Sequence, residues 1–309
     1  MDVAKQTVLS KFALSQADFF ARGMEAEVYR YGADAVFKLY APTTLLTHLR
    51  QLQAFYSTID RSAISYALPN ILHVSTQGAY TVTIEKYLIG QPLAELIKMT
   101  QPRQLEPIFI SYVNAVLELA TVSMPVTTTA YKLFDPHKLS KHAQGDWHTF
   151  LRRWLIHQLQ TLSPYFERDV TDLGFKLRTM LRILNQPYDG AYTLIHGDIF
   201  PGNVLVAPDG RPLALLDFGL FTMYGDPLFD AATAWVFFDM YDELEANIRG
   251  RLLPFFLNLL GTEAVGKLYR YVLLYSLLSA NTYATDCSDG HYRWCVANLN
   301  TEAYWKRIV

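Results

Sequence analysis

The fold is decided by residues 195–204, which read IHGDIFPGNV, and by residues 215–219, which read LLDFG. In each stretch polar side chains follow a short apolar run: Asp198 and Asn203 in the first, Asp217 in the second. Short apolar runs bounded by Gly, Pro and Asp predict strands that end in loops. Two carboxylates and an amide on such loops suit phosphoryl transfer. One carboxylate can take the proton of an attacking hydroxyl, while the other and the amide hold a divalent cation against phosphate oxygens.

Asp and Asn are also common turn formers beside Gly and Pro, which gives these residues an alternative, purely local interpretation. A His-Gly-Asp triplet with Asn five positions after its Asp could arise by chance. An Asp-Phe-Gly triplet follows fourteen positions after that Asn, again with an apolar flank. The two motifs together, in this order and at this spacing, favour a phosphoryl-transfer site over a chance arrangement of turn residues.

Composition excludes several classes of protein. The chain has 309 residues, a length typical of about two domains or lobes. Its residues are 51% apolar and 14% aromatic, and this much apolar surface excludes a mainly disordered chain. The net charge of −2 offers no global positive field for nucleic acid. Two cysteines do not make a disulfide scaffold, and the apolar runs at 252–260 and 271–280 are too short to span a bilayer. We expect a cytoplasmic protein that binds neither nucleic acid nor membrane.

Hydrophobic periodicity divides the chain into a β-rich part and a helical part. Period-two patterns and turn residues predict five strands in the first ninety residues, and one stretch there has helical spacing. From Leu93 the period is mostly helical, apart from the strand-like island at 192–216. The expected strands are 19–23, 27–30, 35–40, 71–75 and 79–87, with a helix at 43–57. We therefore predict an α+β chain with a β-rich lobe at 1–88 and a larger helical lobe at 89–309.

The island resembles the catalytic and metal loops of the aminoglycoside phosphotransferase family, the small-molecule branch of the protein-kinase-like fold. The resemblance implies a two-lobe kinase-like fold and transfer of a phosphoryl group from ATP, or GTP, to a hydroxyl. It implies Asp198 as the base, Asn203 and Asp217 as ligands of Mg²⁺, and a structural role for His196. Downstream, GDPLFDAA at 225–232 resembles the family segment in which the second Asp, here Asp230, braces the catalytic loop. The implied assembly is a monomer or homodimer.

Upstream landmarks of the same family follow in the family's order. VFKLY at 36–40 resembles the strand whose Lys, here Lys38, pairs with nucleotide phosphates. The segment at 85–93 resembles the hinge whose backbone meets the adenine, which implies contacts at Glu85 and Tyr87. The segment at 23–29 resembles the phosphate-covering hairpin, and the residues it implies there are Gly23, Glu25 and Val28.

One departure concerns the helix Glu that pairs with the strand Lys in kinase-like folds. Residues 43–58 contain no Asp or Glu. Three explanations stay open. An amide or imidazole of that helix (His48, Gln51 or Gln53) replaces the carboxylate, or Glu25 or Glu27 of the hairpin approaches Lys38, or the chain is a nucleotide-binding pseudokinase without turnover. The retained Asp198, Asn203 and Asp217 favour activity.

The acceptor is predicted to be a small molecule, because only residues 220–224 separate the Asp-Phe-Gly loop from the Gly-Asp-Pro segment and leave no room to dock a peptide. An amine-bearing acceptor such as an aminoglycoside is favoured, which would make the protein an antibiotic-resistance enzyme. Choline-like alcohols, homoserine and sugars are the alternatives. The candidate acceptor ligands are acidic: Asp226, Asp239, Asp242 and Glu243. Basic residues dominate the expected cap at 131–168, which argues against a polycation.

Cys287, His291 and Cys295 are spaced by four residues, which would stack three metal ligands on one helix face. No fourth ligand is evident, and the Ser-Asp-Gly sequence at 288–290 predicts a loop inside the motif. We therefore predict two reduced thiols and no zinc site.

Overall fold

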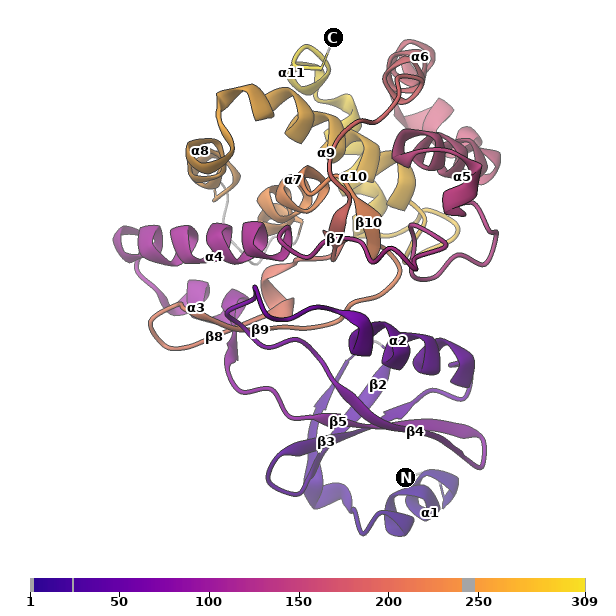
Figure 1. Cartoon of the computed structure of the whole chain (residues 1–309), viewed down its shortest axis with the longest axis vertical. Helices are drawn as coiled ribbons and strands as arrows, with labels where there is room; N and C mark the ends of the chain where they lie inside the picture. The colour runs from indigo at the N-terminus through magenta and orange to yellow at the C-terminus, as the bar shows by residue number, and fades with distance from the viewer. Residues whose placement is uncertain (1–2, 24, 241–247, 309) are drawn as a thin grey trace.

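The computed structural model describes residues 3–23, 25–240 and 248–308. They form a small β-rich lobe and a larger helical lobe, which lie one above the other in Figure 1. The small lobe holds a five-stranded antiparallel sheet in the order β1-β2-β3-β5-β4. Its strands are β1 Phe19–Arg22, β2 Ala26–Tyr31, β3 Ala35–Tyr40, β4 Ile71–Gln77 and β5 Tyr80–Lys86. The predicted α+β, kinase-like fold class is confirmed.

The two faces of this sheet have different partners, because side chains alternate along each strand. Tyr29, Phe37 and Val82 point to one face and pack with Val8 and Leu9 of helix α1 (Val3–Lys11). The opposite face meets helix α2 (Leu46–Thr58), which lies between the sheet and the helical lobe in Figure 1. Helix α1 was not predicted from the sequence, and α2 begins three residues later than predicted.

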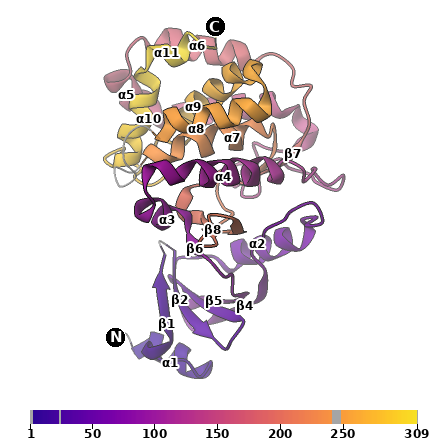
Figure 2. The same cartoon turned by 90° about the vertical axis from the view of Figure 1, so that its left-hand side faces the viewer.

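The helical lobe is built around two buried helices, α7 and α9. Every residue of α7 from Phe229 to Val236 is buried, and so is every residue of α9 from Tyr271 to Ser279. Figure 2 shows α7, α8 and α9 stacked above α4. The helices are α3 Leu93–Met99, α4 Leu105–Leu119, α5 Trp147–Asp169, α6 Leu173–Leu184, α7 Leu228–Val236, α8 Ile248–Leu260, α9 Val265–Ser279, α10 Gly290–Asn300 and α11 Glu302–Trp305.

Two small sheets between the lobes carry the island that the sequence singled out. β7 (Thr193–Ile195) pairs with β10 (Met223–Gly225). β8 (Val204–Val206) pairs with β9 (Pro212–Leu215) on one side and with β6 (Gln91–Pro92) on the other. The β7–β8 loop and the segment after β9 therefore lie together below the helical core.

The cysteine motif is interrupted as predicted. Helix α10 begins at Gly290, and the carboxylate of Asp289 caps it by accepting a bond of 2.7 Å from the Tyr292 N–H. Cys287 precedes that helix, and both cysteines are free thiols. Within the described ranges no group of three or more acidic, His or Cys side chains is placed to hold a metal ion. None of the described helices is long and apolar enough to cross a bilayer.

Candidate active site

The β7–β8 loop is held by one carboxylate of α7. Asp230 accepts hydrogen bonds of 2.7 Å from the backbone N–H groups of both His196 and Gly197. It is almost fully buried, and burial raises its pKa to about 7 although the two N–H groups act against this rise. These two charge-assisted bonds fix the backbone immediately before Asp198.

His196 joins the two motifs of the island. Its Nε2 lies 2.7 Å from the carbonyl oxygen of Leu216, and its Nδ1 accepts a bond of 3.1 Å from the Asp198 N–H. Burial lowers the pKa of His196 to about 4, so the imidazole is neutral and Nε2 carries the donated proton. The ring also packs on Phe218, with centroids 4.2 Å apart. His196 therefore joins the two loops through both ring nitrogens and through ring packing.

Asp198 is partly exposed and contacts Asn203, which ends a single 3-10 turn (Pro201–Asn203). The amide nitrogen of Asn203 donates to the carbonyl oxygen of Asp198 at 3.0 Å and to its carboxylate at 3.3 Å. Burial, and after it the charge of Asp217, raises the pKa of Asp198 to about 7, while the bond from Asn203 acts against this rise.

Asp217 is exposed, and its backbone is left-handed with φ of 59°. Asp tolerates this conformation better than most residues. In the part of the chain that the structure describes, neither its carboxylate nor Oδ1 of Asn203 takes part in a hydrogen bond or ion pair. Carboxylate and amide oxygens are the ligands that Mg²⁺ prefers, with phosphate oxygens and water filling the remaining positions. The two side chains therefore fit a magnesium ion held together with a nucleotide.

Lys38 of β3 forms an ion pair with Glu85 of β5, at 3.0 Å. Glu85 is buried, and it also accepts bonds from the hydroxyl of Thr83 at 2.7 Å and from that of Tyr40 at 3.3 Å. Burial would lower the pKa of Lys38, but the negative charges of Glu85 and, to a smaller extent, Asp217 hold it well above its usual value. Lys38 is therefore a charged ammonium.

This pairing corrects the expectation about the partner of Lys38. The partner is neither an α2 side chain nor a hairpin Glu. Gln51 donates to the carbonyl of Leu133, and Gln53 donates to that of Ile71. The side chain of Glu85 was not predicted as the partner, because the β3–β5 register cannot be read from the sequence.

His48 and the two hairpin acids also lie elsewhere. The imidazole of His48 packs against the ring of Phe134, with centroids 5.2 Å apart. Glu27 pairs with Lys5 of α1, and Glu25 is exposed.

The residues predicted for the phosphate-covering hairpin and the hinge lie on the small sheet or at its edge. Gly23 donates its N–H to the carbonyl of Ala26 at 2.9 Å and closes the β1–β2 hairpin. Val28 lies opposite Lys38 in the β2–β3 register. The N–H of Tyr87 donates to the carbonyl of Asp34 at 2.8 Å, so this donor is already engaged.

The acidic residues that were predicted to meet the acceptor are only partly described. Asp226 is buried, and its two oxygens accept bonds from the Leu228 N–H and the Tyr271 hydroxyl, at 3.0 and 2.9 Å. It therefore braces the start of α7. Asp239 ends a 3-10 turn after α7, while Asp242 and Glu243 lie outside the described residues.

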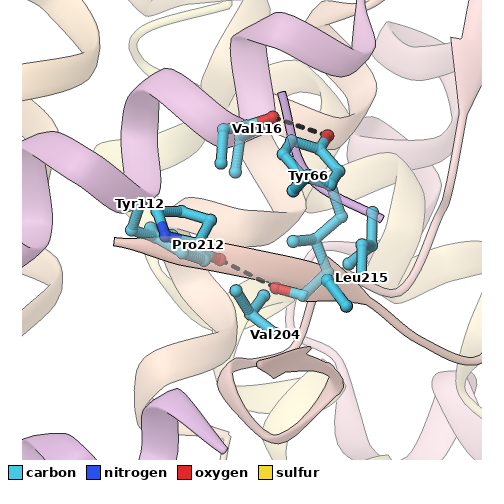
Figure 3. A pocket seen from close by; sticks show the side chains of 9 residues that line it. Tyr66, Tyr112, Val116, Val204, Pro212 and Leu215 are labelled. Atoms are coloured by element: carbon cyan, nitrogen blue, oxygen red, sulfur yellow. Dashed lines mark hydrogen bonds between the residues drawn. The ribbon is translucent and has the colours of Figure 1, made fainter. Parts of the chain in front are cut away.

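An apolar cavity is lined by side chains of α4, of the β7–β8 loop and of strands β8 and β9, together with Tyr66 (Figure 3). Tyr66, Tyr112 and Val204 are among its lining residues, and its volume is about 10 Å³. That volume is at the lower limit for one water molecule, so the cavity is a packing gap and not a ligand site.

The comparisons with known proteins agree with this fold. The model of the phosphotransferase enzyme family matches residues 17–264. A gentamicin complex of APH(2")-IIa has a TM-score of 0.67 at 16% identity, over 100% of this chain and 99% of that chain. ADP-bound aminoglycoside phosphotransferase APH(2'')-Ib has a TM-score of 0.61 at 15% identity, over 100% of both chains. Macrolide 2'-phosphotransferase type I has a TM-score of 0.56 at 14% identity, over 98% of this chain and 97% of that chain. No curated protein matches the chain in sequence.

Proposed function

The chain belongs to the phosphotransferase enzyme family, and we propose that it transfers the γ-phosphoryl group of ATP or GTP to a hydroxyl of a small molecule. The observation that carries this proposal is the arrangement of three groups on braced loops. Asp198 lies beside Asn203, and the free oxygens of Asn203 and Asp217 suit a divalent cation. Structural neighbours solved with ATP, ADP or GDP support a nucleotide as the donor.

In the proposed reaction the carboxylate of Asp198 accepts the proton of the acceptor hydroxyl. The acceptor oxygen forms a bond to the γ-phosphorus, and the bond from that phosphorus to the β–γ bridging oxygen breaks, which releases the nucleoside diphosphate. Lys38 holds the remaining phosphates, and the hairpin of Gly23, Glu25 and Val28 covers them. Mg²⁺ held by Asn203 and Asp217 would neutralise charge on the phosphate oxygens.

The variant Asp198→Asn tests the role of the base. We expect release of ADP to fall by about 10²–10⁴-fold, the usual contribution of a positioned base, with nucleotide binding nearly unchanged. Asp209→Asn is the matched control, because Asp209 is an exposed turn carboxylate between β8 and β9 that bonds only a local N–H in the described structure. Full activity of the Asp198 variant would overturn the assignment.

For the acceptor we propose a hydroxyl compound that carries an amine. Neighbours solved with gentamicin or streptomycin support this class. A coupled ADP-release screen over aminoglycosides, macrolides, choline-like alcohols, amino acids and neutral sugars tests it. Turnover with amine-bearing alcohols is expected. Turnover confined to neutral sugars would overturn the amine and leave the phosphotransfer proposal standing.

A further inference from the structure

The partner of Lys38 comes from the same sheet. In the antiparallel register Lys38 lies opposite Thr83, and Val36 lies opposite Glu85. Because residues two apart share a face, Lys38, Thr83 and Glu85 point to the same side, and the ion pair joins diagonal neighbours on adjacent strands. In the described structure the side chains that hydrogen-bond or ion-pair with the Glu85 carboxylate all belong to β3 or β5: Lys38, Tyr40 and Thr83.

Helix α2 contributes no charge to this arrangement. Its sequence, LTHLRQLQAFYST, contains no acidic residue. The side chains that it buries are Leu49, Phe55 and Tyr56, and two of these are aromatic rings packed on or beside Phe218. The helix therefore contacts the Asp-Phe-Gly loop through apolar packing and does not hold the ammonium.

A second carboxylate, that of Asp217, also attracts the Lys38 ammonium electrostatically. The ammonium sits on a flexible four-carbon stem with three rotatable donors, so a fixed partner is needed to hold its orientation. Glu85 is that partner at 3.0 Å, and it leaves the other donors of Lys38 for phosphate oxygens.

We propose that Glu85 is the positioning residue that holds Lys38 for the nucleotide phosphates, so that the orientation of Lys38 is set within the sheet and does not depend on α2. This inference rests on the proposed function. It predicts that loss of the Glu85 charge weakens binding of phosphate-bearing ligands selectively. Loosening α2 leaves that binding unchanged.

The test is calorimetric binding of ADP and of adenosine to the full chain and its variants. In Glu85→Gln we expect ADP affinity to fall about tenfold and adenosine affinity to stay within about twofold. Glu85→Asp, which keeps the charge on a shorter stem, should recover part of the ADP affinity. Gln53→Ala removes the bond of 2.9 Å that ties α2 to β4, and it should lower the melting temperature without changing ADP affinity.

The outcomes separate this inference from the proposed function. A wild-type chain that binds neither ligand would overturn the proposed function itself. A wild-type chain that binds ADP while Glu85→Gln binds it equally well would overturn only the inference. An equal loss of ADP and adenosine would also overturn it, since that pattern indicates general unfolding of the site.

Two further variants guard against a folding defect. If Glu85→Gln does not fold, Thr83→Val removes the hydroxyl that orients Glu85 at 2.7 Å and should lower ADP affinity selectively by a smaller factor. In a Lys38→Met background, Glu85→Gln should cause no further loss of ADP affinity. A further loss there would show that Glu85 acts independently of Lys38 and would overturn the inference.

Discussion

Two lysine–glutamate pairs lie on opposite faces of the same five-stranded sheet, and they differ in what surrounds them. On the α1 face, Lys5 pairs with Glu27, which also bonds Arg22 and the hydroxyl of Tyr29. On the α2 face, Lys38 pairs with Glu85 within the sheet and also lies in the field of Asp217 from the other lobe. The first pair ties the N-terminal helix to the sheet, and the second faces the groups of the candidate site.

The two pairs differ in whether the charged groups find all their partners within the small lobe. Glu27 is surrounded by donors whose hydrogen bonds outweigh the effect of its burial and lower its pKa to about 2. Its pair is complete within the lobe. Lys38 has three donors and, in the described structure, a single carboxylate within ion-pair distance. The unused donors of Lys38, in the field of the Asp217 carboxylate, suit the binding of an anionic ligand such as a nucleotide with its cation.

The largest expected effect is on the phosphotransfer rate, when the positive charge of Lys38 is removed and that of Lys5 serves as the comparison. Lys38→Met should lower the phosphotransfer rate by on the order of 10²-fold, because it removes the charge that would meet the phosphates. Lys5→Met should leave the rate within about twofold at temperatures below its melting point. Steady-state kinetics on both variants provide the check. Equal losses would remove the proposed distinction between the two faces.

The second effect is on stability and its pH dependence. The pKa of Glu27 is lowered from 4.5 to about 2 on folding, so its charge stabilises the fold above pH 4.5 and this contribution is lost as the pH falls toward 2. Glu27→Gln should therefore lower the free energy of unfolding by on the order of 2 kcal/mol at pH 7. Urea unfolding of both proteins from pH 7 downward should show the two curves converging in acid. A gap that is constant with pH would contradict this account.

A smaller effect distinguishes the two tyrosines that donate to these carboxylates. The hydroxyl of Tyr29 lies 2.5 Å from Glu27, whereas that of Tyr40 lies 3.3 Å from Glu85. Short charge-assisted bonds are the stronger ones, so Tyr29→Phe should cost about 1–2 kcal/mol of stability and Tyr40→Phe less than about 1 kcal/mol. Thermal unfolding of the matched pair gives the order, and the reverse order would count against the geometry.

The strands of the small lobe and the loops that carry Asp198 and Asp217 were predictable from the sequence, because each is marked by local signals. Val82 and Ile84 alternate with polar residues in β5, and Gly, Pro and Asp flank the loops that hold Asp198 and Asp217. Such patterns depend on neighbours in the chain, and the observed strands differ from the predicted ones by only a few residues at their ends.

The features that sequence reasoning missed depend on contacts between distant segments. Helix α1 buries only Val8 and Leu9, which is too little apolar periodicity to mark a helix. The pairing of Lys38 with Glu85 depends on the register between β3 and β5, whose chain positions are separated by α2 and β4. Two carboxylates of the small lobe, Glu27 and Glu85, look alike in the sequence, and only the faces on which they lie assign them different partners.

The most direct test of phosphotransfer to a small molecule is to follow the γ-phosphate itself. ATP with a radioactive γ-phosphate is incubated with the full chain, Mg²⁺ and an amine-bearing alcohol that supports ADP release, and the products are separated. We predict that the label appears on the acceptor, one phosphoryl group per ADP released, and that Asp198→Asn slows this transfer by about 10²–10⁴-fold. Label found only as free phosphate, or attached to the protein chain, would contradict the account.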